Sequence, residues 1–216
     1  MVEKLRVAYK ATFEGKFQEA LAQFQYILHA ILFLVAESRQ EVNEIKELIQ
    51  ICREYVLGIQ MELERKDLAV AKQNPPRQVE LSAYFTHCKL QPVHLVLALR
   101  SAMNSSFKIK NYGMAGSFAR RLLELNPKAE VANQARKVAK LCERTPVDQQ
   151  NVNYDSRNPF VLCGTSHYPI YQGTPVSRCP YCSAAHGVSC KGSVCTVCNL
   201  AQIGKECGGP QFLPAQ

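Results

Sequence analysis

The sequence lacks any apolar run long enough to cross a membrane. Its most apolar stretch, Tyr26 to Ala36, has only eleven residues, whereas a membrane-spanning helix needs about 20. No secretory or organelle-targeting segment opens the chain. We therefore expect a cytoplasmic protein in which this stretch forms a helix of the core.

Motifs of the common enzyme classes are also missing. The chain has no phosphate-binding glycine loop, no Gly-x-Ser-x-Gly and no His-Glu-x-x-His, the marks of nucleotide-binding proteins, serine hydrolases and zinc proteases. No two carboxylates stand in a context that suggests general acid–base catalysis. The sequence thus predicts a binding protein and no enzyme.

Acidic residues are fewer than basic ones, 18 against 26, which gives a formal charge of +8. Nearly all of the excess lies before Pro146, because only four Lys/Arg and three Asp/Glu follow it. The basic residues are interleaved with acidic ones, and no aromatic residues alternate with them to stack bases. This distribution is typical of solvated helix faces, so we expect no specific nucleic-acid partner.

Apolar residues recur at helical spacing from the start of the chain. Between Phe17 and Val35 they form one broad face in steps of three and four residues. A narrower seam follows from Val42 to Leu63, and its strict alternation suits antiparallel packing against the preceding helix. Asn74-Pro75-Pro76 ends this pair, since a residue before proline avoids helical dihedral angles.

Three more helical segments are expected beyond this break. One runs over Val79–Lys89, one starts at Pro92, and one follows Asn126 as a helix N-cap. Small Gly and Ala residues in Tyr112–Leu125 allow two helices to approach closely, and this stretch resembles a tetratricopeptide unit. No clean 34-residue period recurs. We expect an irregular, tetratricopeptide-like helical-repeat domain.

The composition changes at Thr145–Asn151, where apolar periodicity stops and Gly, Pro, Ser and Cys become frequent. We place a domain boundary there, with a helical domain over residues 1–145 and a Cys-rich β module over 146–216. Short strands are expected at Phe160–Leu162, Tyr168–Tyr171 and Asn199–Ile203. The predicted fold class is therefore mainly α, with a small C-terminal β-rich module similar to a zinc ribbon.

Two Cys-x-x-Cys pairs dominate this module. Each pair can hold one side of a tetrahedral Zn²⁺, and the short segment between them matches the spacing of zinc ribbons. Four thiolates fill the coordination sphere and leave no position for water, so the site is predicted to be structural. The expected ligands are Cys179, Cys182, Cys195 and Cys198.

Five further Cys and His residues lie near these ligands. Cys163 and His167 have the spacing of half a second metal site, and the sequence does not decide between such a site and ordinary packing. A disulfide framework is not expected, because the chain is long and three cysteines stand singly on helical segments. The residues left open are Cys163, His167, His186, Cys190 and Cys207.

Four short motifs, taken in order, give the chain a specific resemblance. They are Asn158-Pro159-Phe160, Pro169-Ile170-Tyr171, Lys191-Gly192 followed by Cys195, and Ile203-Gly204-Lys205. With the helical segments before them, the whole chain resembles the C-terminal domain of the coatomer alpha subunit. The zinc ligands follow from the spacing of the cysteines and are not implied by this resemblance.

The resemblance implies a function in a COPI vesicle coat. In that family the domain docks the coatomer epsilon subunit, itself a tetratricopeptide protein, and reaches other coatomer subunits through the full-length chain. The coat serves Golgi-to-ER and intra-Golgi transport, so the expected location is the cytosolic face of Golgi and vesicle membranes, with no membrane contact except through the coat. The alternative from spacing alone is a zinc-ribbon adaptor that binds nucleic acid through its basic helices.

Aromatic residues close to the predicted strands are candidates for the partner interface. Phe160, Tyr168 and Tyr171 lie close together in sequence, and buried aromatic side chains contribute much of the affinity at protein interfaces. Packing of the same rings within the small module is the alternative. We expect these three residues to contribute to binding of the epsilon subunit.

Overall fold

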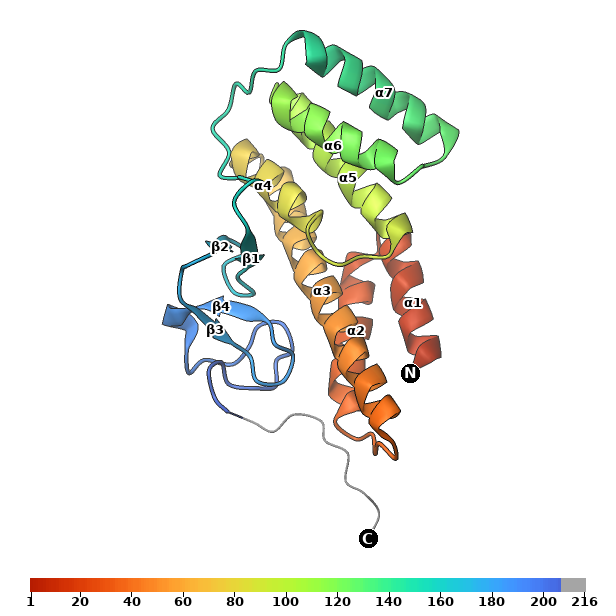
Figure 1. Ribbon diagram of the computed structural model, residues 1–216, viewed down its shortest axis with the longest axis vertical. Helices are drawn as coiled ribbons and strands as arrows, with labels where there is room; N and C mark the ends of the chain where they lie inside the picture. The colour runs from red at the N-terminus through yellow and green to blue at the C-terminus, as the bar shows by residue number, and fades with distance from the viewer. Residues whose placement is uncertain (207–216) are drawn as a thin grey trace. The chain divides into compact units, whose positions relative to one another are not determined.

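A computed structural model describes residues 1–206 of the chain (Figure 1). Within this part, seven helices precede four three-residue strands and a 3-10 turn, η1 (Val188–Cys190). None of these helices is both long enough and apolar enough to span a bilayer. The helices are α1 (Val2–Phe13), α2 (Phe17–Ile31), α3 (Arg39–Val70), α4 (Pro75–Phe85), α5 (Pro92–Lys108), α6 (Tyr112–Glu124) and α7 (Ala129–Arg144).

The chain groups into two compact units. The first combines Met1–Ile59 with the residues from Ser156 onward, and the second contains Gln60–Asp155. The last helix ends at Arg144, next to the boundary predicted from the composition. That residues 1–145 and 146–216 form separate domains stays a prediction.

Three aromatic rings hold the helices of the first unit together. Tyr9 of α1, Phe24 of α2 and Tyr55 of α3 lie with ring centroids 4.6 to 6.0 Å apart, and Phe24 stacks on Tyr55. Phe24 is fully buried and Tyr55 nearly so. Because these rings come from three helices, they fix the packing of all three.

The predicted seam of α3 is confirmed in part in the first unit. Val42, Ile49, Cys52, Val56 and Ile59 are buried, whereas Ile45 is only half-buried. The buried surface is also wider than one narrow stripe, because residues 55–59 are all buried.

The broad apolar face that we predicted up to Val35 is too long. Helix α2 ends at Ile31, and the apolar run continues into an exposed turn. Phe33 and Val35 have 86% and 87% of their surface exposed. Helical periodicity could not show this end, because apolar residues continue past it without a Gly or Pro.

Helices α5, α6 and α7 form the core of the second unit with Ala83 of α4. A Cβ atom on Gly116 of α6 would lie only 3.1 Å from Cys142 Cβ of α7. The small residues of α6 therefore permit the close helix approach that the sequence predicted. Buried side chains of this core include Leu99, Met103, Phe118, Leu122 and Ala135.

Two predicted helix starts in the second unit were wrong. Helix α4 begins at Pro75, four residues before Val79, and Asn74 caps it by accepting from the backbone N–H of Arg77 at 3.1 Å. Helix α7 begins at Ala129, and its N-cap position is Lys128, so Asn126 lies two residues too early to cap the helix. Asn is a preferred cap residue, which is why sequence alone favoured the cap there.

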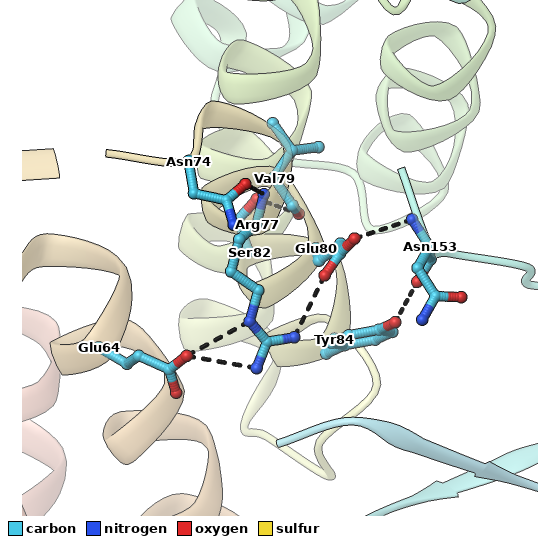
Figure 2. A network of polar contacts seen from close by, with 8 residues as sticks. All are labelled: Glu64, Asn74, Arg77, Val79, Glu80, Ser82, Tyr84 and Asn153. Carbon is cyan, nitrogen blue, oxygen red and sulfur yellow. Dashed lines mark hydrogen bonds and ion pairs between the residues drawn. The ribbon is translucent and has the colours of Figure 1, made fainter. Parts of the chain in front are cut away.

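A buried polar network anchors the segment that follows α7 (Figure 2). The Arg77 guanidinium of α4 pairs with Glu80 and Glu64, both at 3.2 Å. Glu80 then accepts from the backbone N–H of Asn153 at 2.9 Å, and the Tyr84 hydroxyl donates to the Asn153 carbonyl. Buried charges need such partners, so this network fixes residues around Asn153 on α4.

The same segment also caps α6. The Asp148 carboxylate accepts from the backbone N–H of Met114 at 3.2 Å, and Asn111 exchanges two hydrogen bonds with the backbone of Gln150. A Cβ on Gly113 would lie 3.1 Å from the Asp148 carboxylate, so the absence of a side chain at Gly113 lets the two approach closely. Residues 147–154 thus form an ordered strap along the second unit.

The strands form two antiparallel hairpins within the described part of the chain. β1 (Phe160–Leu162) pairs with β2 (Pro169–Tyr171), and β3 (Val176–Arg178) pairs with β4 (Ala185–Gly187). The strands β1 and β2 were predicted but their pairing was not, and β3 and β4 were not predicted. Asn199–Ile203 is no strand, although Gln202 forms an isolated bridge with Val194. The β-rich module is present, and a zinc-ribbon fold is not established by these hairpins.

We predict that Phe24→Ala lowers the free energy of unfolding by about 3–5 kcal/mol, because it removes a buried ring from the three-helix contact. Phe33→Ala is the matched control, since its ring is mostly exposed and should change stability by less than about 0.5 kcal/mol. Denaturant titration followed by circular dichroism measures both. Equal effects would show that the aromatic contact does not stabilise the first unit.

Candidate metal centre

Each Cys-x-x-Cys pair forms a tight turn of the same design. In the first, which follows β3, the backbone N–H of Ser183 donates to the Cys179 carbonyl at 3.0 Å; in the second, Asn199 donates to Cys195 at 2.8 Å. Ser183 and Asn199 both have positive φ, near 60° and 55°. The turns therefore direct both sulfurs of a pair to the same side.

The two turns bring the four predicted ligands together. All four sulfurs lie within 4.8 Å of one another and all four residues are buried. The Cys179–Cys198 and Cys182–Cys195 sulfur distances are both 3.7 Å. A tetrahedral ion with metal–sulfur bonds of about 2.3 Å needs sulfurs about 3.8 Å apart, so the donor set fits a tetrahedral metal.

Electrostatics in this cluster also favour a cation. Hydrogen bonding with Cys182, Cys195 and Cys198 lowers the pKa of Cys179, and the same contact with Cys179 raises the pKa of Cys182. Without a metal, the Cys179 thiolate is stabilised while the neighbouring Cys182 keeps its proton. A divalent ion removes this conflict, because it stabilises all four thiolates at once.

Backbone amides support the sulfurs as well. Sγ of Cys179 accepts from the N–H of Cys182, Cys195 from Cys198, and Cys198 from Ala201. Hydrogen bonds to a thiolate favour its charged form. These donors belong to the turns themselves, so the fold of each turn and the charge of its sulfurs stabilise one another.

Helices α2 and α3 contact the ligand turns through three hydrogen bonds in the first unit. The Tyr181 hydroxyl donates to the Leu28 carbonyl at 2.6 Å, and His29 Nε2 lies 2.9 Å from the Cys198 carbonyl. Arg53 of α3 donates to the Cys182 carbonyl at 3.3 Å. Burial, together with the nearby cysteine sulfurs, raises the pKa of Tyr181, so its hydroxyl keeps the proton that it donates.

His186 lies beside the cluster without belonging to it. Its Nε2 is 3.3 Å from the Cys195 sulfur and its Nδ1 is 3.0 Å from the Thr165 hydroxyl. The ring is fully buried. It also neighbours Cys163: burial raises the pKa of that thiol, but hydrogen bonds from His186, Ser166 and Gly187 outweigh burial and lower the pKa to about 5.

A second metal site is not formed by the described residues. Within residues 1–206, the group of three or more potential ligands close enough to share an ion is the four-cysteine cluster. Cys163 and His167 are connected by a backbone hydrogen bond of 3.0 Å, as part of a turn. Cys207 lies outside the described residues.

The three predicted partner-binding residues gather on the first hairpin. Phe160 and Tyr171 are cross-strand neighbours whose ring centroids lie 6.0 Å apart, edge to face. Tyr168 is 46% exposed directly before β2. A cavity of about 270 Å³ lies beside the hairpin, lined by Phe160 and Tyr171 and by the turn that follows.

The structure brings the four predicted ligand cysteines together, but the sequence did not predict the residues around them. The sequence pattern left His186 open and gave His29 no function. It gave Arg53 and Tyr181 no function. Their partners lie 9 to 169 residues away, and no short motif signals such contacts. The position of Tyr181 inside a Cys-x-x-Cys pair was the one available hint.

Comparison with known proteins gives a consistent result. The family model that describes the C-terminus of the coatomer (COPI) alpha subunit matches residues 1–216. Coatomer subunit alpha of Dictyostelium discoideum is 52% identical over 222 residues, covering 100% of this chain and 18% of that protein. Coatomer subunit alpha-1 of Arabidopsis thaliana is 52% identical over 99% of this chain, and coatomer subunit alpha of Saccharomyces cerevisiae is 30% identical over 96%. The chain thus spans less than a fifth of the length of these relatives.

We predict that Tyr181→Phe lowers the free energy of unfolding by about 1 kcal/mol, because it leaves the Leu28 carbonyl without its donor. Tyr26→Phe on the same helix as Leu28 is the control, since that side chain is 54% exposed. Denaturant titration compares the two variants. A loss in Tyr26→Phe as large as in Tyr181→Phe would refute a specific effect of the buried hydroxyl.

Proposed function

The chain belongs to the family formed by the C-termini of coatomer (COPI) alpha subunits, and from this membership we propose that it is a non-enzymatic assembly module of a vesicle coat. The observation that carries the proposal is the match of the family model over residues 1–216, together with relatives about half identical over the whole chain. Its features fit this role, because a helical surface and a buried, closed cysteine cluster suit binding.

The proposed partner is the coatomer epsilon subunit, as the resemblance of the sequence implies. Through this contact the chain would connect epsilon to the other subunits during Golgi-to-ER and intra-Golgi transport, at the cytosolic face of the membrane. The proposal needs no membrane insertion by this chain, which acts on membranes only as part of the coat.

Within the chain, we assign the partner contact to the first hairpin. Phe160 and Tyr171 form an aromatic pair beside a cavity of about 270 Å³, and Tyr168 is exposed at the other end of the same hairpin. A cavity next to half-exposed aromatic rings can receive a side chain of a partner, and aromatic residues are enriched in such contacts. The turn after α2, with Phe33 and Val35, is the second apolar surface of the same unit.

We further propose that the four-cysteine cluster holds Zn²⁺. All-thiolate tetrahedral sites are typical of structural zinc, and the sulfur separations suit its bond length. Cys179, Cys182, Cys195 and Cys198 would supply every ligand. When bound, the ion would supply no catalysis and would hold the two turns together.

Elemental analysis of the purified protein should find one zinc ion per chain. Cys195→Ser should lose the ion, because three thiolates and a hydroxyl bind zinc more weakly than four thiolates. Cys190→Ser is the matched control: Cys190 lies in the same segment, is partly exposed and stands outside the cluster. It should keep the ion.

A protein that is fully folded with no metal would refute the zinc proposal. Two ions per chain would instead establish a second site and make Cys163 and His167 the first ligands to test. Acidification should release the single ion, since protons compete with it for the thiolates.

Binding to purified epsilon subunit should weaken in Tyr168→Ala and in Tyr171→Ala, each by about 1–2 kcal/mol, which is the effect of losing an aromatic contact. Calorimetry measures the affinity, and circular dichroism checks that helix content is unchanged. Phe33→Ala provides the comparison on the other apolar surface. If only Phe33→Ala weakened binding, the interface would lie at the turn after α2 and the hairpin assignment would be wrong.

The basic charge offers a test against the nucleic-acid alternative. We expect association with the epsilon subunit to slow as salt increases, with little change in dissociation, because dispersed charges act mainly on encounter. Binding to DNA or RNA should be weak and insensitive to sequence. Sub-micromolar, sequence-selective binding at physiological salt would overturn the coat assignment.

A further inference from the structure

His186 contacts one sulfur of the proposed metal centre, and the groups around its ring determine which ring nitrogen carries the proton. Nε2 lies 3.3 Å from Cys195 Sγ, and Nδ1 lies 3.0 Å from Thr165 Oγ1. A metal-bound thiolate can only accept a hydrogen bond, so the nitrogen that faces it must carry the proton. A neutral imidazole then accepts at Nδ1, where the Thr165 hydroxyl donates.

The position of the ring is built into the fold. A Cβ on Gly164 would come within 2.8 Å of the imidazole Cε1 and 2.9 Å of a Val197 methyl group, so only glycine leaves room for the ring. Gly164 is itself held at both ends of its peptide: its N–H donates to the Ala185 carbonyl at 2.8 Å, and its carbonyl accepts from Thr196 at 2.6 Å.

Cys163, the other sulfur beside the ring, has donors of its own. The backbone N–H of Gly187 lies 3.4 Å from its sulfur, and Ser166 also donates to it. The imidazole is also a hydrogen-bond partner of Cys163, but this sulfur keeps the Ser166 and Gly187 donors when the ring is removed. Cys195 is the one of the two that belongs to the four-cysteine cluster.

We propose that His186 is a positioning residue of the metal centre, whose Nε2–H donates to the Cys195 thiolate and makes this ligand less basic and less reactive. Four thiolates and one divalent ion carry a net charge of −2, and a buried donor offsets part of it. Such outer hydrogen bonds typically change metal affinity by 10- to 100-fold. The inference rests on the proposed metal site.

The test compares metal-loaded protein with three variants. His186→Leu removes the donor, His186→Gln keeps an N–H at nearly the same distance from the backbone, and Thr165→Val removes the hydroxyl that sets the tautomer. Zinc transfer to a chromophoric chelator gives the rate of metal loss. Alkylation by iodoacetamide, followed by mass spectrometry of the peptides, gives the reactivity of each cysteine.

His186→Leu should release zinc about 10-fold faster and raise alkylation selectively at Cys195. His186→Gln should return both rates toward those of the parent protein, and Thr165→Val should raise them by a smaller factor than His186→Leu. A purely structural role predicts another pattern: all four ligand cysteines would become reactive together, and Gln would not rescue Leu.

Two negative results are distinguishable. Zinc-loaded variants with the same release and alkylation rates as the parent would overturn the inference about His186 and leave the metal site intact. A parent protein that binds neither zinc nor cobalt would overturn the metal site, and the role of His186 with it. Cobalt-loaded parent and His186→Leu should also differ in the energy of the sulfur-to-metal absorption band, and His186→Gln should return the band toward its energy in the parent.

Discussion

Four cysteine sulfurs lie within 4.8 Å of one another, and little else holds the segment that contains them. Its strands are three residues long, and within its described part the buried aliphatic side chains larger than alanine are Leu162, Val197 and Ile203. So few apolar groups cannot outweigh the entropy of ordering such a segment. The metal that we propose at these four thiolates would supply the stabilisation that the core lacks.

The same centre connects the short strands to the helices of the first unit. The carbonyls of two ligands, Cys182 and Cys198, accept from Arg53 and His29, and Tyr181 between the first two ligands donates to Leu28. The helices are thus hydrogen-bonded to the ligand residues themselves or to a residue next to one of them. Loss of the proposed metal would therefore reach α2 and α3, and the turn between them in which Phe33 is exposed.

Sequence patterns predicted those features that depend on residues close together in the chain. These are the buried residues of α3, the strands β1 and β2, and the two Cys-x-x-Cys turns. The start of α7 was missed because Asn126 is of a preferred cap type, whereas Lys128 holds the cap position. His29 and Tyr181 were missed because their partners lie 169 and 153 residues away, a separation that no periodicity encodes.

The first unit is discontinuous in the chain, and this has a consequence for its synthesis. Residues 1–59 leave the ribosome long before their partners from Ser156 onward, while residues 60–155 emerge together. The second unit can therefore fold before the first is complete, because domains generally fold as units during translation. Helix α2 must then wait for its hydrogen bonds with Tyr181 and Cys198 until the C-terminal segment has emerged.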